Sequence, residues 1–462
     1  MALLKQTQIT TMLKKLFPLV LFVIFWVNEK GFSQKLWSLE DCISYAMENN
    51  LDIESQRITT EKQKESFNQS RRNRLPYVSG GTNYGTSYGK SVDPNDNTVT
   101  YNNYSSNNYS VNAGITLFEG FMRNNRIAYS RFMYLAGIEN EKNLKVEIGF
   151  QVMDDFHNTL YSKGLLEIAN EQKQLTELSL KKVRKEAEVG ISAKTDLLEI
   201  EARLADEELQ VIRADNNYKA SLLKLKRSMN YPVHEVLELK GIEETGLIQY
   251  PVFENADSVF IMALQHLPAV RAKMQQLYAV ERELAISKGG ILPSLSLNGS
   301  YNTGYYETYK DDQGNVISFK DQIKNNVSKS VGVSMSVPIF NRWNARSEIK
   351  QRKLDLEKEK VDLDNYKNQL YYEIESYCQD LSAVSAEYLQ AKKQTESNEL
   401  AFEAAQKKKE QGMFNLIDFY TSKNLLSNAQ SELLRTKLLY LLKRKTLDFY
   451  MGKSIFETEP IK

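Results

Sequence analysis

The chain repeats itself at a nearly constant spacing, and this internal duplication limits the possible folds more than any other feature. Leu75-Pro76 recurs as Leu292-Pro293, 217 residues later. Further along the spacing becomes 222 residues: Gly190 recurs as Gly412, Asp196 as Asp418, and Leu197, Leu204, Val211, Tyr218 and Leu225 as Phe419, Leu426, Leu433, Tyr440 and Leu447. A run of matches at one fixed shift predicts two copies of a single structural unit.

The two units are expected at 34–230 and 254–452, joined by a linker at 231–253 that contains two prolines and followed by a short tail at 453–462. Each unit is predicted to contain a helix, two strands and a long helical hairpin, in that order. In the first unit the strands are expected at about 77–89 and 108–118 and the hairpin at about 120–230. In the second unit the strands are expected at about 294–306 and 327–338 and the hairpin at about 341–451.

The hairpins are expected to be unusually long because helix breakers are missing from them. Prolines are absent from 95–231 and from 339–459, and the second stretch contains only two glycines. From Gly120 to Gly190 a continuous helix would be about 105 Å long at 1.5 Å per residue. A helix of that length has no globular core to lie on, and its apolar residues recur every seven positions, which favours coiled-coil packing. An amphipathic helix on a globular core is the alternative.

Residues 1–33 are interpreted as a signal peptide and set aside before fold reasoning. Three lysines precede an uncharged run from Leu16 to Val27, and small residues at Gly31 and Ser33 allow cleavage before Gln34. The run has 12 residues, whereas a membrane-spanning helix needs about 20. An uncleaved membrane anchor is the alternative reading.

The four predicted strands alternate strictly between two kinds of side chain. In the fourth strand Val331, Val333 and Met335 face one way, while Ser330, Gly332, Ser334 and Ser336 face the other. The apolar or aromatic face fits lipid. The other face is small, polar and nearly uncharged, unlike the solvent face of a soluble sheet. Each strand is long enough to cross a bilayer at a tilt, so membrane strands are predicted, with a soluble sheet that caps the helices as the alternative.

Four strands are too few to close a membrane barrel, and an open sheet edge in lipid is prohibitive. The chain is therefore expected to oligomerise, with each copy contributing four strands. Of the closed assemblies, twelve strands from three copies would leave an aqueous channel more readily than eight strands from two.

Helix, strand pair and long hairpin, duplicated behind a signal peptide, resemble the TolC-type outer-membrane efflux protein family. The resemblance covers nearly the whole mature chain. Val189-Gly190-Ile191 followed by Thr195-Asp196 is similar to the family's turn between the helices of its first hairpin, and Gly412 to Asp418 is similar to the corresponding turn in the second half. Leu75-Pro76 and Leu292-Pro293 also follow the family pattern.

The resemblance implies a mainly helical fold with membrane strands, assembled as a homotrimer. The trimer would form a twelve-stranded barrel in the lipid of the outer membrane of a Gram-negative bacterium, continued by a tube of twelve helices across the periplasm. Its implied function is the exit duct of a tripartite efflux or type I secretion system. A periplasmic adaptor and an inner-membrane pump of the RND or ABC type are the implied partners.

The resemblance also assigns roles to residues at the hairpin turns. Val189, Gly190, Ile191, Gly412 and Met413 are expected to be the tips that dock the adaptor.

Two acids near these turns, Asp196 and Asp418, are expected to line the periplasmic entrance. Asp418 matches the first acid of the family's constriction, but Thr421 stands where some members have a second acid. The alternative is that both aspartates only favour the start of a helix through its dipole.

Catalytic and cofactor chemistry are not expected. His157, His234 and His266 are isolated, the two cysteines are far apart, and neither a phosphate-binding loop nor a nucleophile elbow is present. The formal net charge of +1 disfavours nucleic-acid binding. We therefore expect no enzyme, no cofactor and no metal site.

A structural coiled-coil protein of the envelope, such as an adhesin or spacer without channel activity, is the alternative function. Lysine runs such as Lys407 to Lys409 are read as a solvated helix face.

Overall fold

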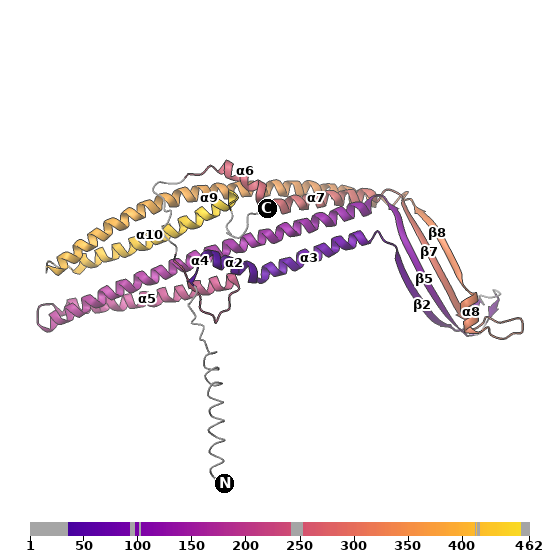
Figure 1. Ribbon diagram of the computed structural model, residues 1–462, viewed down its shortest axis with the longest axis horizontal. Coiled ribbons are helices and arrows are strands. Elements are labelled where there is room, and N and C mark those ends of the chain that lie inside the picture. Colours follow the sequence, from indigo (N-terminus) through magenta and orange to yellow (C-terminus); the bar gives the residue numbers. More distant parts are fainter. Residues whose placement is uncertain are drawn as a thin grey trace, which may run out of the picture.

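The computed structural model of the protein describes residues 36–92, 98–100, 103–241, 253–411, 413 and 416–453. The expected signal peptide at 1–33, residues 242–252 of the linker, Gly412 and nearly all of the tail at 453–462 lie outside these residues. The molecule is elongated, with a long layer of helices and a four-stranded sheet that projects from one end (Figure 1).

The two halves of the chain have the same order of main elements. The first half comprises α2 (Leu39–Asn49), α3 (Leu51–Arg72), β2 (Tyr77–Ser87), β5 (Tyr104–Glu119), α4 (Met122–Glu188) and α5 (Lys194–Met229). The second comprises α6 (Ala256–His266), α7 (Pro268–Gly289), β7 (Ser294–Tyr306), β8 (Ser328–Ser336), α9 (Asn344–Glu410) and α10 (Leu416–Tyr450). The fold is thus a duplicated unit, and α4 and α9 both contain 67 residues.

Several shorter elements are added to the duplicated unit. The parallel pair β1 (Leu36–Trp37) and β6 (Glu238–Leu239) ties the start of the first half to the chain that follows it. The two long loops at the far end of the sheet contain the hairpin β3 (Ser91–Val92) and β4 (Val99–Thr100) and the helix α8 (Phe319–Asn325).

The sheet continues directly into the helices. Its strand order is β2-β5-β7-β8, and all neighbours are antiparallel. Each strand joins one helix of the row α3, α4, α7 and α9, whose consecutive members pack against each other. At the two central junctions the backbones approach so closely that a Cβ on Gly120 would lie 2.3 Å from the carbonyl oxygen of Gly289. Glycine is required there by space.

The two faces of the sheet differ as the alternation indicates. Leu297 pairs with Val333 and Leu295 with Met335, so apolar side chains line up on one face. On the other face the hydroxyl groups of Ser296 and Ser334 lie 2.7 Å apart, as do those of Ser300 and Ser330. The side chain of Val331 is 82% exposed and that of Val333 is 64% exposed. A soluble domain would bury such a face.

One strand departs from strict alternation. The register of β5 against β7 shifts between Thr116 and Phe118, so that Phe118 pairs with Leu295. Alternation predicts Leu117 on the apolar face with Ile115, but this bulge gives that position to Phe118. An extra residue in a strand reverses the facing of every residue after it.

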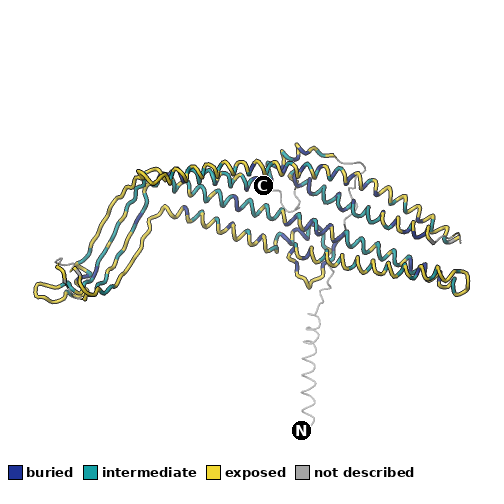
Figure 2. The backbone as a smooth tube through the Cα atoms, turned by 180° about the vertical axis from the view of Figure 1, so that it is seen from behind, coloured by how far each residue is buried: buried dark blue, intermediate teal, exposed yellow. Residues whose placement is uncertain are grey.

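The buried core lies at the middle of the helical layer, where the short helices meet the long ones (Figure 2). The helix that opens each half is divided in two. Asn50 ends α2 and caps α3 by accepting the backbone N–H of Asp52, and Pro268 starts α7 at a position where its missing N–H costs nothing. Among the described residues, no helix is both long and apolar enough to cross a membrane.

Candidate functional site

The turn of the first helical hairpin is a glycine-dependent cap. Helix α4 ends at Glu188, and Gly190 adopts a φ of 76°. The N–H of Ile191 donates to the carbonyl of Glu186 at 2.8 Å, and the N–H of Gly190 donates to that of Ala187 at 3.1 Å. This pair of bonds is the Schellman motif, which favours glycine at the left-handed position. The turn leaves Ile191 77% exposed at the end of the molecule farthest from the sheet (Figure 1).

The turn of the second hairpin lies at the same end of the molecule, beside the first (Figure 1). Gly412 is outside the described residues, whereas Met413 is exposed and donates its N–H to the carbonyl of Lys408. The structure thus brings the predicted tip residues that it describes to one end of the helical layer.

The two predicted entrance acids differ in their surroundings. Asp196 lies in the first turn of α5, and its carboxylate is within 3.4 Å of the Ser192 hydroxyl. Asp418 lies in the first turn of α10, is exposed, and borders a hollow of about 340 Å³ between α9 and α10. The Asp418 side chain is therefore in contact with solvent.

A buried ammonium group joins the two hairpins behind the tips. The side chain of Lys423 on α10 is 1% exposed. Its Nζ donates to the Gln172 carbonyl at 2.6 Å, to the Thr176 hydroxyl at 2.6 Å and to the Glu207 carboxylate at 2.8 Å. An ammonium has three donors, and all three are used. Desolvation lowers the pKa of Lys423, and the adjacent Glu207 opposes this shift.

A second lysine, Lys409 on α9, connects the two hairpins closer to the tips. Lys409 donates to the Ser179 hydroxyl of α4 at 2.7 Å, and its Nζ lies 3.9 Å from the centre of the Phe419 ring. Burial, together with the nearby Lys182 and Lys423, lowers the pKa of Lys409 to about 8. The interpretation of the run Lys407 to Lys409 as a solvated face is therefore wrong for its last member.

Apolar packing surrounds these two lysines. A separate buried cluster joins the hairpins near the tips, with Leu180 and Val183 from α4, Ile200 from α5, Phe402 from α9, and Phe419, Tyr420 and Leu426 from α10. The guanidinium of Arg203 lies 4.1 Å above the Tyr420 ring. Neither Lys423 nor Glu207 was named from the sequence, and Lys409 was included only in a run read as a solvated face. The one sequence feature that could have indicated these residues is that they lie close in sequence to the repeated glycine turns.

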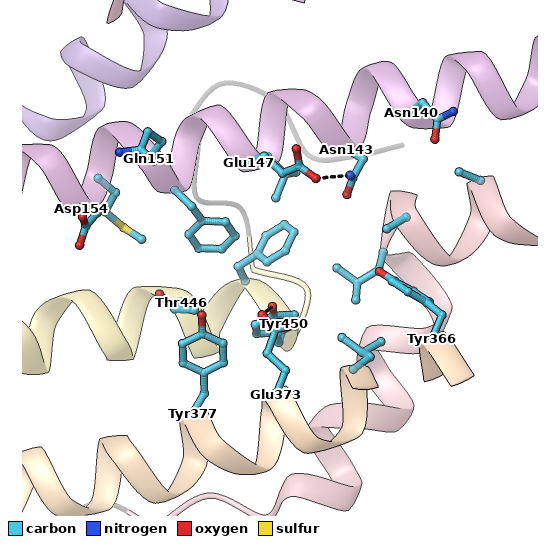
Figure 3. Close-up of a pocket in the computed structure, with 18 of the residues that line it drawn as sticks. Asn140, Asn143, Glu147, Gln151, Asp154, Tyr366, Glu373, Tyr377, Thr446 and Tyr450 are labelled. Carbon is cyan, nitrogen blue, oxygen red and sulfur yellow. Dashed lines mark hydrogen bonds between the residues drawn. The ribbon is translucent and has the colours of Figure 1, made fainter. Parts of the chain in front are cut away.

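A cavity of about 690 Å³ opens in the middle of the helical layer between α4, α7, α9 and α10 (Figure 3). Three carboxylates line it: Glu147, which accepts from Asn143 at 2.7 Å, Glu373, which accepts from the Tyr450 hydroxyl at 2.9 Å, and Asp154. Within the part of the chain that the structure describes, none of these three has an ion pair. Lys273 and Lys443 also line the cavity, and Lys443 is paired with Asp380. The unpaired carboxylates can attract cations to this wall.

The histidines do not converge on a site. The His157 imidazole is buried, burial lowers its pKa to about 4, and its Nδ1 lies 2.7 Å from the Met153 carbonyl. His266 contacts the carbonyl of Phe449. Across the described residues, no group of three or more His, Cys, Asp or Glu side chains could hold a metal ion.

A duplicated unit of strand pair and long helical hairpin, with an exposed apolar sheet face, defines a class of elongated outer-membrane channel subunits. The family model for outer membrane efflux proteins matches residues 42–231 and 260–453, one match in each half. The chain belongs to the outer membrane efflux protein family and is an outer-membrane protein. Members of this family are channels and not enzymes.

Known proteins resemble this chain along most of its length. The alkaline protease secretion protein AprF of Pseudomonas aeruginosa is 22% identical over 330 residues, which are 70% of this chain and 66% of AprF. The outer membrane protein TolC of Vibrio cholerae is 23% identical over 297 residues, 63% of this chain and 64% of TolC. The chain thus aligns with just under two thirds of the length of these two relatives.

Solved structures share the fold. The outer membrane channel CmeC of Campylobacter jejuni superposes with a TM-score of 0.75 at 16% identity, covering 91% of this chain and 87% of CmeC. The outer membrane protein VceC of Vibrio cholerae gives a TM-score of 0.74 at 11% identity, covering 90% and 96% of the two chains.

Proposed function

We propose that the protein forms the outer-membrane exit duct of a tripartite efflux or type I secretion system. The observation that carries this proposal is the sheet, whose apolar face is exposed while its other face is a ladder of uncharged Ser, Asn and Gly side chains. An apolar exterior and a small polar interior are what a water-filled membrane barrel needs. Passage through such a duct is passive, so a partner must supply the energy.

The duct is a homotrimer in this proposal. Strands β2 and β8 are the two edges of the sheet, and an open edge cannot remain unpaired in lipid. Pairing β8 of one copy with β2 of the next would close the sheet, and three copies give twelve strands. The row of helices that continues the strands would close into a tube at the same time.

A periplasmic adaptor and an inner-membrane pump of the RND or ABC type are the proposed partners. The apolar tips support adaptor docking because Val189 and Ile191 are exposed side by side with the Met413 turn at the end remote from the sheet. AprF is named for alkaline protease secretion and CmeC as an outer membrane channel, which supports an export role.

Conductance through a planar bilayer tests the function. The purified protein is expected to form channels, and its native mass in detergent is expected to correspond to three mature chains. A structural spacer would give neither result. A stable monomer without channel activity would therefore refute the duct and favour the spacer.

The docking role of the first tip predicts the effect of Gly190→Pro. Proline fixes φ near about −65° and has no N–H, so it can neither adopt the φ of 76° nor donate to Ala187. Export measured in cells is expected to be lost while trimers still reach the membrane. Gly241→Pro, in the segment after α5, is the control and should leave export intact. Normal export with Gly190→Pro would put docking elsewhere.

The entrance role of Asp418 predicts a change in ion block. Three copies around one axis would form an acid ring, and charge rings set the selectivity of pores. Asp418→Asn is expected to weaken block by trivalent cations from the periplasmic side by about tenfold and to reduce cation preference. Asp196→Asn is the comparison and should have a smaller effect. Unchanged block and selectivity in Asp418→Asn would reduce this acid to a helix-start residue.

A further inference from the structure

The four junctions between strands and helices carry a concentration of positive charge. Residues 71–76, 119–126, 288–293 and 338–350 together contain nine Lys and Arg but only two Glu, in a chain with 60 basic and 59 acidic residues. The loops at the opposite end of the sheet, 88–103 and 307–327, contain four Lys and six acids. The net charge is thus positive at the end of the sheet that joins the helices and negative in the loops at the opposite end.

Most of the arginines at these junctions have no acidic partner. Arg74 donates to the side chain of Asn124 at 2.9 Å, and Arg123 donates to the backbone carbonyl of Thr116 at 2.9 Å. The guanidinium of Arg346 lies 4.3 Å above the ring of Trp343. Within the described ranges, six of the seven arginines at the junctions lack an ion pair: Arg71, Arg74, Arg123, Arg126, Arg342 and Arg346. Their charge is available to an anion from outside the chain.

The backbone is also strained at the junctions between strands and helices. Phe121, Arg342 and Trp343 have φ values of 62°, 55° and 64°, and they are three of the four non-glycine residues with positive φ in the described part of the chain. Such values are unusual for bulky residues and persist only where the surroundings hold them. Phe121 and Trp343 are 222 residues apart, which is the spacing of the repeat. Both halves therefore keep the same strained turn before the long helix.

The strained turns present aromatic rings at the border of the apolar face. The Phe121 ring packs edge-on against Phe118, at 5.3 Å, and Phe118 belongs to the apolar face of the sheet. Trp343 is 60% exposed. Tryptophan prefers the boundary between hydrocarbon and headgroups. The arginines thus lie at the level expected for lipid phosphates.

We propose that a junction collar, made of Arg74, Arg123, Arg126, Arg342, Arg346 and Trp343, binds the phosphate groups of anionic phospholipids in the membrane leaflet that faces the helices. The guanidinium fork matches phosphate oxygens, and clustered basic residues concentrate anionic lipid. This inference rests on the proposed embedding of the sheet in the membrane. The collar would fix the depth of the sheet in the bilayer.

Lipid binding to the full-length assembly in detergent tests the collar. Fluorescent phosphatidylglycerol is titrated against the wild type, the collar variant Arg74→Gln/Arg342→Gln/Arg346→Gln and the control variant Arg57→Gln/Arg184→Gln/Arg213→Gln, in which three exposed arginines of the helical layer lose the same charge. The collar variant is expected to weaken binding by about tenfold or more, and the wild-type affinity should fall as salt screens the charges. The control should change binding by less than about twofold.

Equal affinities in all three proteins, or equal losses in both variants, would overturn the proposal. Conductance in neutral bilayers is measured in parallel. A collar variant with unchanged lipid affinity but altered ion selectivity would mean that the arginines face the pore, and it would also overturn the proposal. Failure of the proposed function is separate, because it would appear as absent conductance in the wild type whatever the lipid affinity.

The depth of Trp343 gives a second, independent measurement. The mature sequence has two tryptophans, Trp37 and Trp343, so Trp37→Phe leaves Trp343 as the sole tryptophan reporter. In vesicles containing brominated phosphatidylglycerol, its fluorescence is expected to be quenched more by bromine near the headgroup than by bromine near the bilayer centre. Absence of quenching, or stronger quenching by the deep probe, would contradict an interfacial collar.

Discussion

Lys423→Met is expected to lower the free energy of separating the two helical hairpins by about 3 kcal/mol. The reason is that removing one partner of a buried ion pair leaves the other charge uncompensated. Methionine fills a similar volume but donates nothing to Thr176 or to the Glu207 carboxylate, whose side chain is only 16% exposed. The loss corresponds to about a hundredfold lower protection from local opening.

Hydrogen exchange of the backbone amides in 172–210 and 400–430 measures this opening. Lys358→Met is the matched control. Lys358 is 74% exposed and forms a surface pair with Asp362 at 2.5 Å, and such pairs contribute about 0–1 kcal/mol. Unchanged protection near the tips in Lys423→Met would show that apolar packing alone joins the hairpins.

Val333→Arg is expected to destabilise the sheet in lipid by about 2–4 kcal/mol if its position lies near the middle of the bilayer. Val333 pairs with Leu297 on the apolar face. The neighbouring Ser334→Arg adds the same side chain to the polar face, where it loses mainly the contact with Ser296, a cost of about 1 kcal/mol. Urea unfolding from vesicles compares the two variants. Equal destabilisation would undo the assignment of the two faces.

The large features could be predicted because they follow from simple periodicities. Two proline-free stretches around Gly190 and Gly412 indicate long hairpins, and alternation indicates the strands. The bulge could not be found, because Leu117 and Phe118 are both apolar and either could continue the pattern. The break after Asn50 was also missed, although asparagine before an acidic residue is a common helix start. The two-residue strands β1 and β6 are too short to have a periodicity.

The polar contacts near the tips escaped prediction for a different reason. Lys423 and Lys409 are lysines on long, highly charged helices, where the ordinary position of a lysine is in solvent. Lys423 is removed from water where α10 packs against α4, and Lys409 of α9 by its contacts with Ser179 of α4 and Phe419 of α10. Their partners come from the other half of the chain, so no local spacing connects Lys423 with Glu207, 216 residues away. Duplication predicted which helices are equivalent but not which side chains meet.

Helices α4 and α9 have the same length, 67 residues each, and this length fixes the distance between the sheet and the tips. Each residue adds about 1.5 Å, so losing one turn from α4 alone would put one tip about 5 Å out of level with the other. The same change would rotate the apolar stripe away from its neighbours. A change of length is compatible with this architecture only when both halves change together, in steps that keep the seven-residue repeat. The two copies, although their sequences have diverged, are therefore bound to a common length, and that length sets how far from the membrane the protein can reach.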